Sequence, residues 1–162
     1  MQPDPGDDPA ADDVLLWRAP DSVPRRPRRP RRVLVVDDYR DAADALRLLL
    51  EARGFECRVA DDPFAVCDVA RDWQPFAVVL DIAMPGLDGL ELATRLRGDP
   101  QTSDMLLIAC SGLVSQRDRE QAKEAGFDAH CAKPLTPHRL LGYLESASGG
   151  AVTPDEDVTR PL

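Results

Sequence analysis

The chain has 162 residues, a formal net charge of −9 and 43% hydrophobic residues, a composition that suits one domain of ordinary size with tails. No apolar run approaches the ~20 residues that cross a bilayer, and the acidic N-terminus lacks the apolar core of a signal peptide. We therefore expect a cytoplasmic protein without a membrane partner, and the acidic balance argues against nucleic acid as a partner.

Residues 1–31 form an extension rich in Pro, Asp and Arg without hydrophobic periodicity, and we predict that it is mostly disordered. Its acidic start is followed by a run of arginines that are spaced by prolines. The apolar patch Val14–Trp17 lies between these two blocks. This patch either contacts the domain without specificity or is a short docking segment for the domain itself or for a partner.

From residue 32 onward, short apolar runs alternate with amphipathic helical patterns, which predicts βα repeats and a parallel sheet. Asp62 is the expected N-cap of the second helix, and Gly54 is the expected end of the first. The expected elements are strand 32–36, helix 40–53, strand 57–60, helix 63–72, strand 76–80, a helix from 88, strand 105–110, helix 116–125, strand 128–132 and helix 136–147. Residues 148–162 are expected to form a flexible acidic tail.

Asp81 stands where an apolar run ends and a segment with Pro and Gly begins. Open α/β sheets place their ligand sites at the carboxyl ends of the strands. A carboxylate at that position acts as a metal ligand, as a nucleophile or as both. Taken alone, Asp81 is explained equally well as a turn former or a helix cap.

Asp37 and Asp38 end another apolar run as an adjacent pair. Two neighbouring carboxylates repel each other unless a cation or a basic side chain neutralises them. Mg²⁺ (or Mn²⁺) binds one or two carboxylates together with water and phosphate oxygens. The alternative is that the pair only begins the next helix, where acids are favoured, but this explains one aspartate better than two.

Ser111 and Lys133 complete the set of polar residues at predicted strand ends. The Ser111 hydroxyl can donate a hydrogen bond to a phosphoryl oxygen, although Ser-Gly is also an ordinary turn signal. Lys133 precedes a proline, which stops further strand pairing. A lysine near three carboxylates is a compact counter-charge and a phosphate ligand.

In this order the motifs strongly resemble the receiver domain of response regulators in two-component and phosphorelay systems. They are Val35-Val36-Asp37-Asp38, the segment 81–89 reading D-x-x-M-P-G-x-D-G, Ala109-Cys110-Ser111-Gly112, and Ala125-Gly126-Phe127-Asp128 leading to Lys133-Pro134. The resemblance covers residues 32–147, the expected domain. It implies an α/β, flavodoxin-like (βα)5 doubly wound parallel sheet with strand order 2-1-3-4-5.

The resemblance also implies a mechanism in which Asp81 accepts a phosphoryl group from a histidine kinase or a histidine phosphotransfer protein. The implied metal ligands are Asp37, Asp38, Asp81 and the backbone carbonyl of Ala83, while Lys133 and Ser111 contact the phosphoryl oxygens. A downstream protein would dock on the face of the fourth helix, fifth strand and fifth helix, and homodimerisation stays open. Such a domain assists its own phosphorylation and dephosphorylation but is not an enzyme.

Two features depart from the commonest family pattern. The position of the aromatic switch residue, three before Lys133, is His130, whose ordinary pKa lies near physiological pH. His130 is either the switch residue or a half-buried strand residue that is hydrogen-bonded in place. The positions that tune hydrolysis of the acyl phosphate are the apolar residues Ala83 and Leu113, which predicts a long-lived phosphoryl state.

Two other function classes compete with this interpretation. A receiver-like module that works without phosphorylation typically loses one or more of the residues that bind the metal and the phosphoryl group. This chain keeps all five of them: Asp37, Asp38, Asp81, Ser111 and Lys133. A phosphatase with an aspartate nucleophile usually carries a second aspartate two residues later, where this chain has Ala83. Because no output domain follows the fifth helix, we expect a stand-alone receiver that signals through protein contacts.

Overall fold

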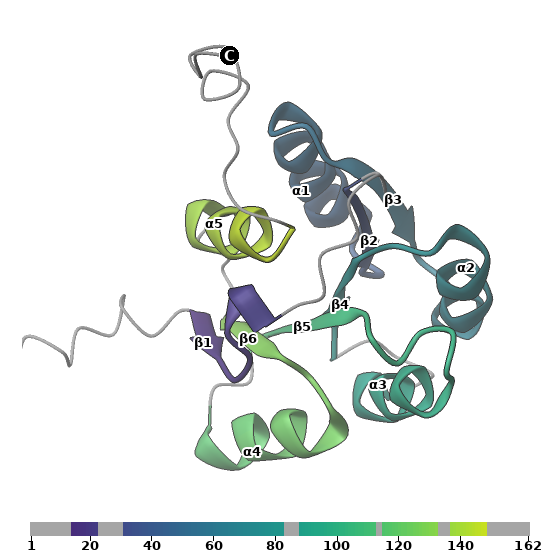
Figure 1. Ribbon diagram of the computed structural model, residues 1–162, viewed down its shortest axis with the longest axis vertical. Coiled ribbons are helices and arrows are strands. Elements are labelled where there is room, and N and C mark those ends of the chain that lie inside the picture. The colour runs from purple at the N-terminus through teal and green to yellow at the C-terminus, as the bar shows by residue number, and fades with distance from the viewer. Residues whose placement is uncertain (1–13, 23–30, 83–87, 113–114, 133–136, 149–162) are drawn as a thin grey trace, which may run out of the picture.

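A central sheet with helices on both faces forms the body of the computed structural model (Figure 1). The structure describes residues 14–22, 31–82, 88–112, 115–132 and 137–148. The strands are β1 Val14–Leu16, β2 Arg32–Val36, β3 Glu56–Ala60, β4 Ala77–Asp81, β5 Leu106–Ser111 and β6 Ala129–Ala132. The helices are α1 Arg40–Ala52, α2 Val66–Trp73, α3 Gly89–Gly98, α4 Gln116–Ala125 and α5 Pro137–Ala147, with short 3-10 helices η1 Pro20–Ser22 and η2 Pro63–Ala65.

The sheet has the order β1-β6-β5-β4-β2-β3. The five strands from β2 to β6 are parallel, and counted from Arg32 they have the expected order 2-1-3-4-5. The difference from the expected fold is β1, a sixth strand that pairs antiparallel with β6. The flavodoxin-like arrangement is therefore confirmed, with one strand added at its edge.

The added strand comes from the segment 1–31, for which we expected mostly disorder, and at residues 14–22 that expectation is wrong. The physical reason is that β6 would otherwise be an edge strand with unpaired backbone groups. Val14 packs against the core cluster on the α5 side of the sheet, and Trp17 packs against the cluster on the other side. Residues 1–13, 23–30 and 149–162 lie outside the described residues, and the division into extension, domain and tail stays a prediction.

Helix boundaries agree closely with the expected ones because the caps are local. The carboxylates of Asp62 and Asp88 accept hydrogen bonds from backbone amides at the starts of η2 and α3, and the Ser115 hydroxyl does the same for α4. The expected helix 63–72 differs in detail, since its first turn is the 3-10 helix η2 and only the remainder is α-helical.

Two apolar clusters hold the layers together, one on each face of the sheet. The first joins the strands to α1 and α5, for example through Leu50 and Leu144. The second joins them to α2, α3 and α4. In α4 only Ala122 is fully buried among its residues, as expected for a charge-rich and weakly apolar helix.

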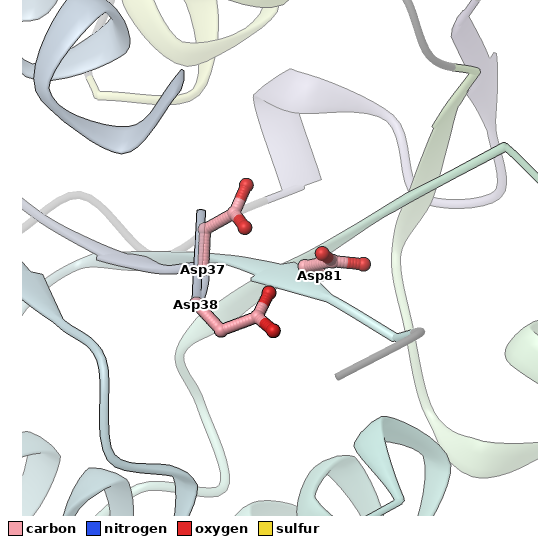
Figure 2. A group of neighbouring side chains, drawn as sticks. All are labelled: Asp37, Asp38 and Asp81. Carbon is pink, nitrogen blue, oxygen red and sulfur yellow. The ribbon is translucent and has the colours of Figure 1, made fainter. Parts of the chain in front are cut away.

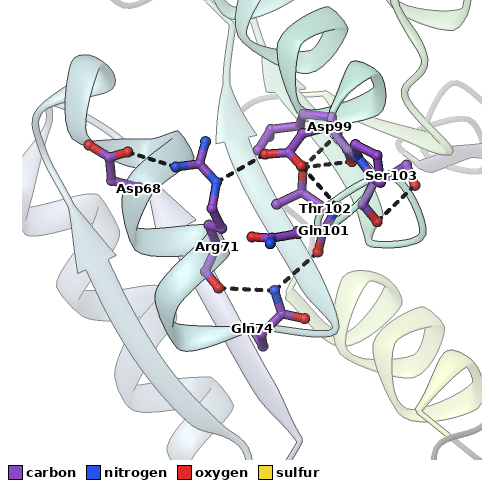
Figure 3. Close-up of polar contacts among 9 residues, drawn as sticks. Asp68, Arg71, Gln74, Asp99, Gln101, Thr102 and Ser103 are labelled. Carbon is purple, nitrogen blue, oxygen red and sulfur yellow. Dashed lines mark hydrogen bonds and ion pairs between the residues drawn. The ribbon is translucent and has the colours of Figure 1, made fainter.

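A polar network fixes α2 against the turn that follows α3 (Figure 3). Arg71 donates to the Asp99 carboxylate at 3.0 Å, and the side-chain amide of Gln74 donates to the carbonyls of Arg71 and Gln101, each at 3.0 Å. Gln74 ends α2 with a left-handed φ of 57°. These contacts join the C-terminal end of α2 to the turn that follows α3.

Among the residues that the structure describes, no helix combines the length and the apolar character that crossing a bilayer requires.

Candidate functional site

Three carboxylates gather at the carboxyl ends of β2 and β4. Each of Asp37, Asp38 and Asp81 offers an oxygen atom, and these three atoms lie within 4.8 Å of one another. Figure 2 shows the three side chains at the two strand ends, with Asp37 and Asp38 next to each other and the Asp38 carboxylate directed toward Asp81. Asp37 and Asp81 are each only 7% exposed, whereas Asp38 is open to solvent.

Backbone contacts set the positions of the two buried aspartates. The Asp37 amide donates to the carbonyl of Ala60 at 3.3 Å, and its Oδ1 accepts from the amide of Tyr39 at 2.9 Å. Asp81 is the last residue of β4, where it lies opposite Cys110 of β5. The amide of Ile82 donates to the Cys110 carbonyl at 3.2 Å, so the pairing with β5 continues just past Asp81.

The carboxylate cluster fits a hard divalent cation. Three negative groups at such short separation repel one another, and a cation between them removes that repulsion. Oxygen ligands at a partly open site are what Mg²⁺ prefers, because this ion keeps several of its waters. One open carboxylate beside two buried ones leaves a side from which an ion can enter.

Ser111 ends β5, the strand next to Asp81, and its side chain is fully buried. The register of β4 and β5 sets Asp81 opposite Cys110, so Ser111 lies one residue further along toward the carboxyl edge. The site therefore draws on three neighbouring strands. Lys133, Ala83 and Leu113 lie outside the described residues, and the roles expected of them stay predictions.

His130 lies in the middle of β6, between Ala109 of β5 and Leu15 of β1. It is 2% exposed, and its Nε2 is buried without a hydrogen-bond partner among the described residues. Burial lowers the pKa of His130, and the nearby positive charge of Arg119 lowers it further, while Asp118 acts in the opposite direction. The sequence left open that His130 is a half-buried strand residue held by a hydrogen bond. The structure instead buries His130 almost completely, and its Nε2 has no hydrogen-bond partner among the described residues.

Sequence reasoning missed the contacts that surround β6. Asp128, just before β6, accepts hydrogen bonds from the Arg97 guanidinium at 2.5 Å and from the Leu107 amide at 2.9 Å. The backbone carbonyl of Asp128 also accepts from the amides of Trp17 and Arg18. The only sequence signal for the contacts of Trp17 and Arg18 with Asp128 was the apolar run 14–17 in an otherwise polar extension.

Residues 33–145 match the family model of the response regulator receiver domain. The chain is 32% identical over 114 residues to the phosphate regulon transcriptional regulatory protein PhoB of Pseudomonas aeruginosa, covering 70% of this chain and 50% of that protein. It is 35% identical over 113 residues to an uncharacterised 14.6-kDa protein of Leptolyngbya boryana, covering 70% of this chain and 86% of that protein.

Solved structures agree with the sequence relatives. A response regulator from Chloroflexus aurantiacus, described as putative in its own report, superposes with a TM-score of 0.69 at 28% identity, over 74% of this chain and 98% of that one. The chemotaxis response regulator CheY4 of Vibrio cholerae superposes with a TM-score of 0.68 at 23% identity, over 74% of this chain and 99% of that one, and shows the shared fold.

The chain spans about half the length of several of its curated relatives, among them PhoB and the response regulator MprA of Mycobacterium. Residues 33–145 of this chain match the receiver domain, which is a phosphoacceptor signalling domain. With the sheet order, the carboxylates at the strand ends and the match over residues 33–145 all in agreement, the chain belongs to the response regulator receiver family.

Proposed function

We propose that Asp81 accepts a phosphoryl group from a phosphohistidine of a histidine kinase or a histidine phosphotransfer protein. The observation that supports this most directly is the cluster of Asp37, Asp38 and Asp81, whose oxygens lie within 4.8 Å of one another at the carboxyl edge of the sheet. A carboxylate at that edge can attack phosphorus while its neighbours help to hold a divalent cation.

In this reaction an oxygen of Asp81 forms a bond to phosphorus as the bond from phosphorus to the histidine nitrogen breaks. The products are an acyl phosphate on Asp81 and a free imidazole on the partner. Asp37, Asp38 and Asp81, with the carbonyl of Ala83, would hold Mg²⁺ or Mn²⁺, which neutralises charge on the phosphoryl group. Ser111 and Lys133 would each contact a phosphoryl oxygen, so that the protein's main contribution is positioning.

The acyl phosphate adds roughly −1.5 to −2 charges to the end of β4. Ser111 lies on the adjacent strand, and its movement toward that charge would shift the population of two states of β5 and β6. We propose that His130 responds to this shift and that a downstream protein reads it on the face formed by α4, β6 and α5. Homodimerisation through this face is compatible with the same scheme.

The test is intact-mass analysis after incubation with acetyl phosphate and Mg²⁺. We expect an adduct of one phosphoryl group that disappears when EDTA is added beforehand and is absent from Asp81→Asn. Asp41→Asn is the matched control, since Asp41 is an exposed carboxylate in the first turn of α1. Its adduct should form at the wild-type rate.

A folded protein that forms no adduct and does not bind beryllofluoride would contradict the proposal. It would favour the phosphorylation-independent interaction module instead. If the adduct forms, its decay after removal of acetyl phosphate measures the lifetime, which the apolar Ala83 and Leu113 predict to be long. Replacing either residue by a polar one should then shorten it.

A further inference from the structure

The N-terminal segment Val14–Ser22, here called the strap, occupies the edge of β6. Its strand β1 places Val14 opposite Cys131, Leu15 opposite His130 and Leu16 opposite Ala129. In Figure 1 the strap (purple) lies at the end of the sheet, with α5 on one side and α4 on the other. The strap therefore covers the strand at the centre of the face that we propose for partner docking.

Specific contacts hold the strap in this place. The amides of Trp17 and Arg18 donate to the Asp128 carbonyl at 2.8 and 3.1 Å, and the guanidinium of Arg18 lies 3.7 Å from the Asp128 carboxylate. The hydroxyl of Tyr143 in α5 donates to the Arg18 carbonyl at 2.8 Å. Trp17 packs against the apolar cluster on the α4 side of the sheet.

The strap is nevertheless a small element. Its strand has three residues, and Leu16 is 45% exposed. The buried hydrogen-bonded core strands open only with the whole domain, whereas short elements with partial burial open at a much lower free-energy cost. The strap can thus leave the β6 edge without unfolding the parallel sheet.

We propose that the strap is an autoinhibitory element that competes in cis with protein partners for the face formed by α4, β6 and α5. An edge strand accepts one neighbour, so a partner that adds to β6 or contacts His130 from that side must first displace β1. The inference rests on the proposed function, because phosphorylation of Asp81 is the event that favours the open state through Ser111 and β6.

The position of His130 supports this coupling. His130 is the residue of β6 that lies between Ala109 of β5 and Leu15 of the strap. A rotation of its buried side chain toward solvent must pass the strand that now pairs with it. The strap therefore stabilises the state with His130 buried, and any ligand or modification that favours the other state destabilises the strap by the same free energy.

Fluorescence of Trp17 tests the proposal in the full chain. The protein has two tryptophans, so Trp73→Phe leaves Trp17 as the only one. We expect acrylamide quenching of Trp17 to rise by about twofold or more when acetyl phosphate and Mg²⁺ are added. Asp81→Asn in the same background should show no change, and intact mass is measured on each sample.

The two proposals fail in different ways in this experiment. If the folded protein forms no adduct and does not bind beryllofluoride, the proposed function is wrong, and the coupling of the strap to Asp81 falls with it. If the adduct forms and neither the quenching nor the emission maximum of Trp17 changes, the strap inference is wrong and the proposed function stands.

A second pair of variants tests the strap without phosphorylation. Tyr143→Phe removes the hydroxyl that binds the Arg18 carbonyl, and it should raise Trp17 quenching and hydrogen exchange at residues 14–18 severalfold. The matched control is Tyr39→Phe, which removes the only other tyrosine hydroxyl, on an exposed side chain. If Trp73→Phe does not fold, hydrogen exchange at residues 14–18 is measured in chains that keep Trp73. Equal exchange at these residues in Tyr143→Phe and Tyr39→Phe would overturn the inference.

Discussion

The guanidinium of Arg97, in the last turn of α3, lies 2.5 Å from Oδ2 of Asp128, the residue that precedes β6. Arg97 also donates to three backbone carbonyls, those of Gly126, Ser103 and Met105. One side chain thus ties α3 to the turn before β5 and to the turn before β6. Because the strap binds the same Asp128, Arg97 also fixes the point at which the strap is anchored.

Loss of this guanidinium should destabilise the whole domain. We expect Arg97→Ala to lower the free energy of unfolding by about 2 kcal/mol or more, since it leaves the partly buried Asp128 carboxylate short of its closest partner. Urea unfolding measures the difference. Arg95→Ala is the matched control: it removes an exposed i,i+4 pair with Glu91 on the same helix, and should cost under about 1 kcal/mol. Equal losses in the two variants would contradict a special role for Arg97.

Gly89 has no room for a side chain, because this first residue of α3 lies against Ile82, the residue that follows Asp81. A Cβ added at Gly89 would lie 2.5 Å from the Cα of Ile82, a backbone atom that cannot rotate away. We expect Gly89→Ala to cost about 1–3 kcal/mol of stability and to slow the phosphorylation of Asp81 by displacing the end of β4. Gly98→Ala, at the other end of α3, meets no atom within 4 Å and should be neutral or slightly stabilising. A phosphorylation rate unchanged in Gly89→Ala would show that the end of β4 absorbs the clash.

The parallel sheet and the carboxylate cluster were both predictable from sequence, for a physical reason that they share. A buried parallel strand needs an unbroken apolar run, and the residue after that run must lie at the carboxyl edge, so the sequence alone predicts that Asp37, Asp38 and Asp81 lie together. The strand order was predictable only from the resemblance to a family, since the βα pattern alone allows several orders.

Docking of the segment 14–17 on the domain was one of two alternatives from sequence, but the β1–β6 pairing and the Arg97–Asp128 pair could not be predicted, because both depend on contacts between distant parts of the chain. Arg97 and Asp128 are 31 positions apart and share no periodic pattern. The three residues of β1 form a strand only because β6 offers an unpaired edge. Local propensity does not contain that information.

Divalent cations should stabilise the protein through the carboxylate cluster. We expect the melting temperature to rise when MgCl₂ is added and to fall back when EDTA removes the ion, because binding to the folded state alone shifts the equilibrium toward it. Asp38→Asn should melt higher than the wild type without Mg²⁺, since one of three repelling charges is gone, and should gain less from added Mg²⁺. Asp41→Asn is the control that leaves the cluster intact. An equal Mg²⁺ response in Asp38→Asn and the wild type would place the ion elsewhere.

His130 should make the protein less stable in mild acid. Its pKa in the folded protein is lowered, first by burial and then by the positive charge of Arg119. Above the unfolded pKa of about 6.5 both states hold a neutral imidazole, and the contribution of this residue to stability is fully present. As the pH falls below that value the unfolded chain takes up the proton first, so the free energy of unfolding decreases until the folded pKa is passed.

His130→Phe should remove this part of the pH dependence, since the phenylalanine ring is apolar and has no proton to gain. Urea unfolding at pH 7.5 and pH 5.5 gives the stability difference for each variant, and we expect it to be smaller in His130→Phe than in the wild type. His138→Gln is the matched control, because His138 is the only other histidine and is exposed on α5, so its removal should leave the difference unchanged. A difference that is the same in His130→Phe and in the wild type would mean that the imidazole of His130 is protonated as easily in the folded protein as in the unfolded chain. Water would then reach the side chain of His130 in β6, although β1 pairs with that strand.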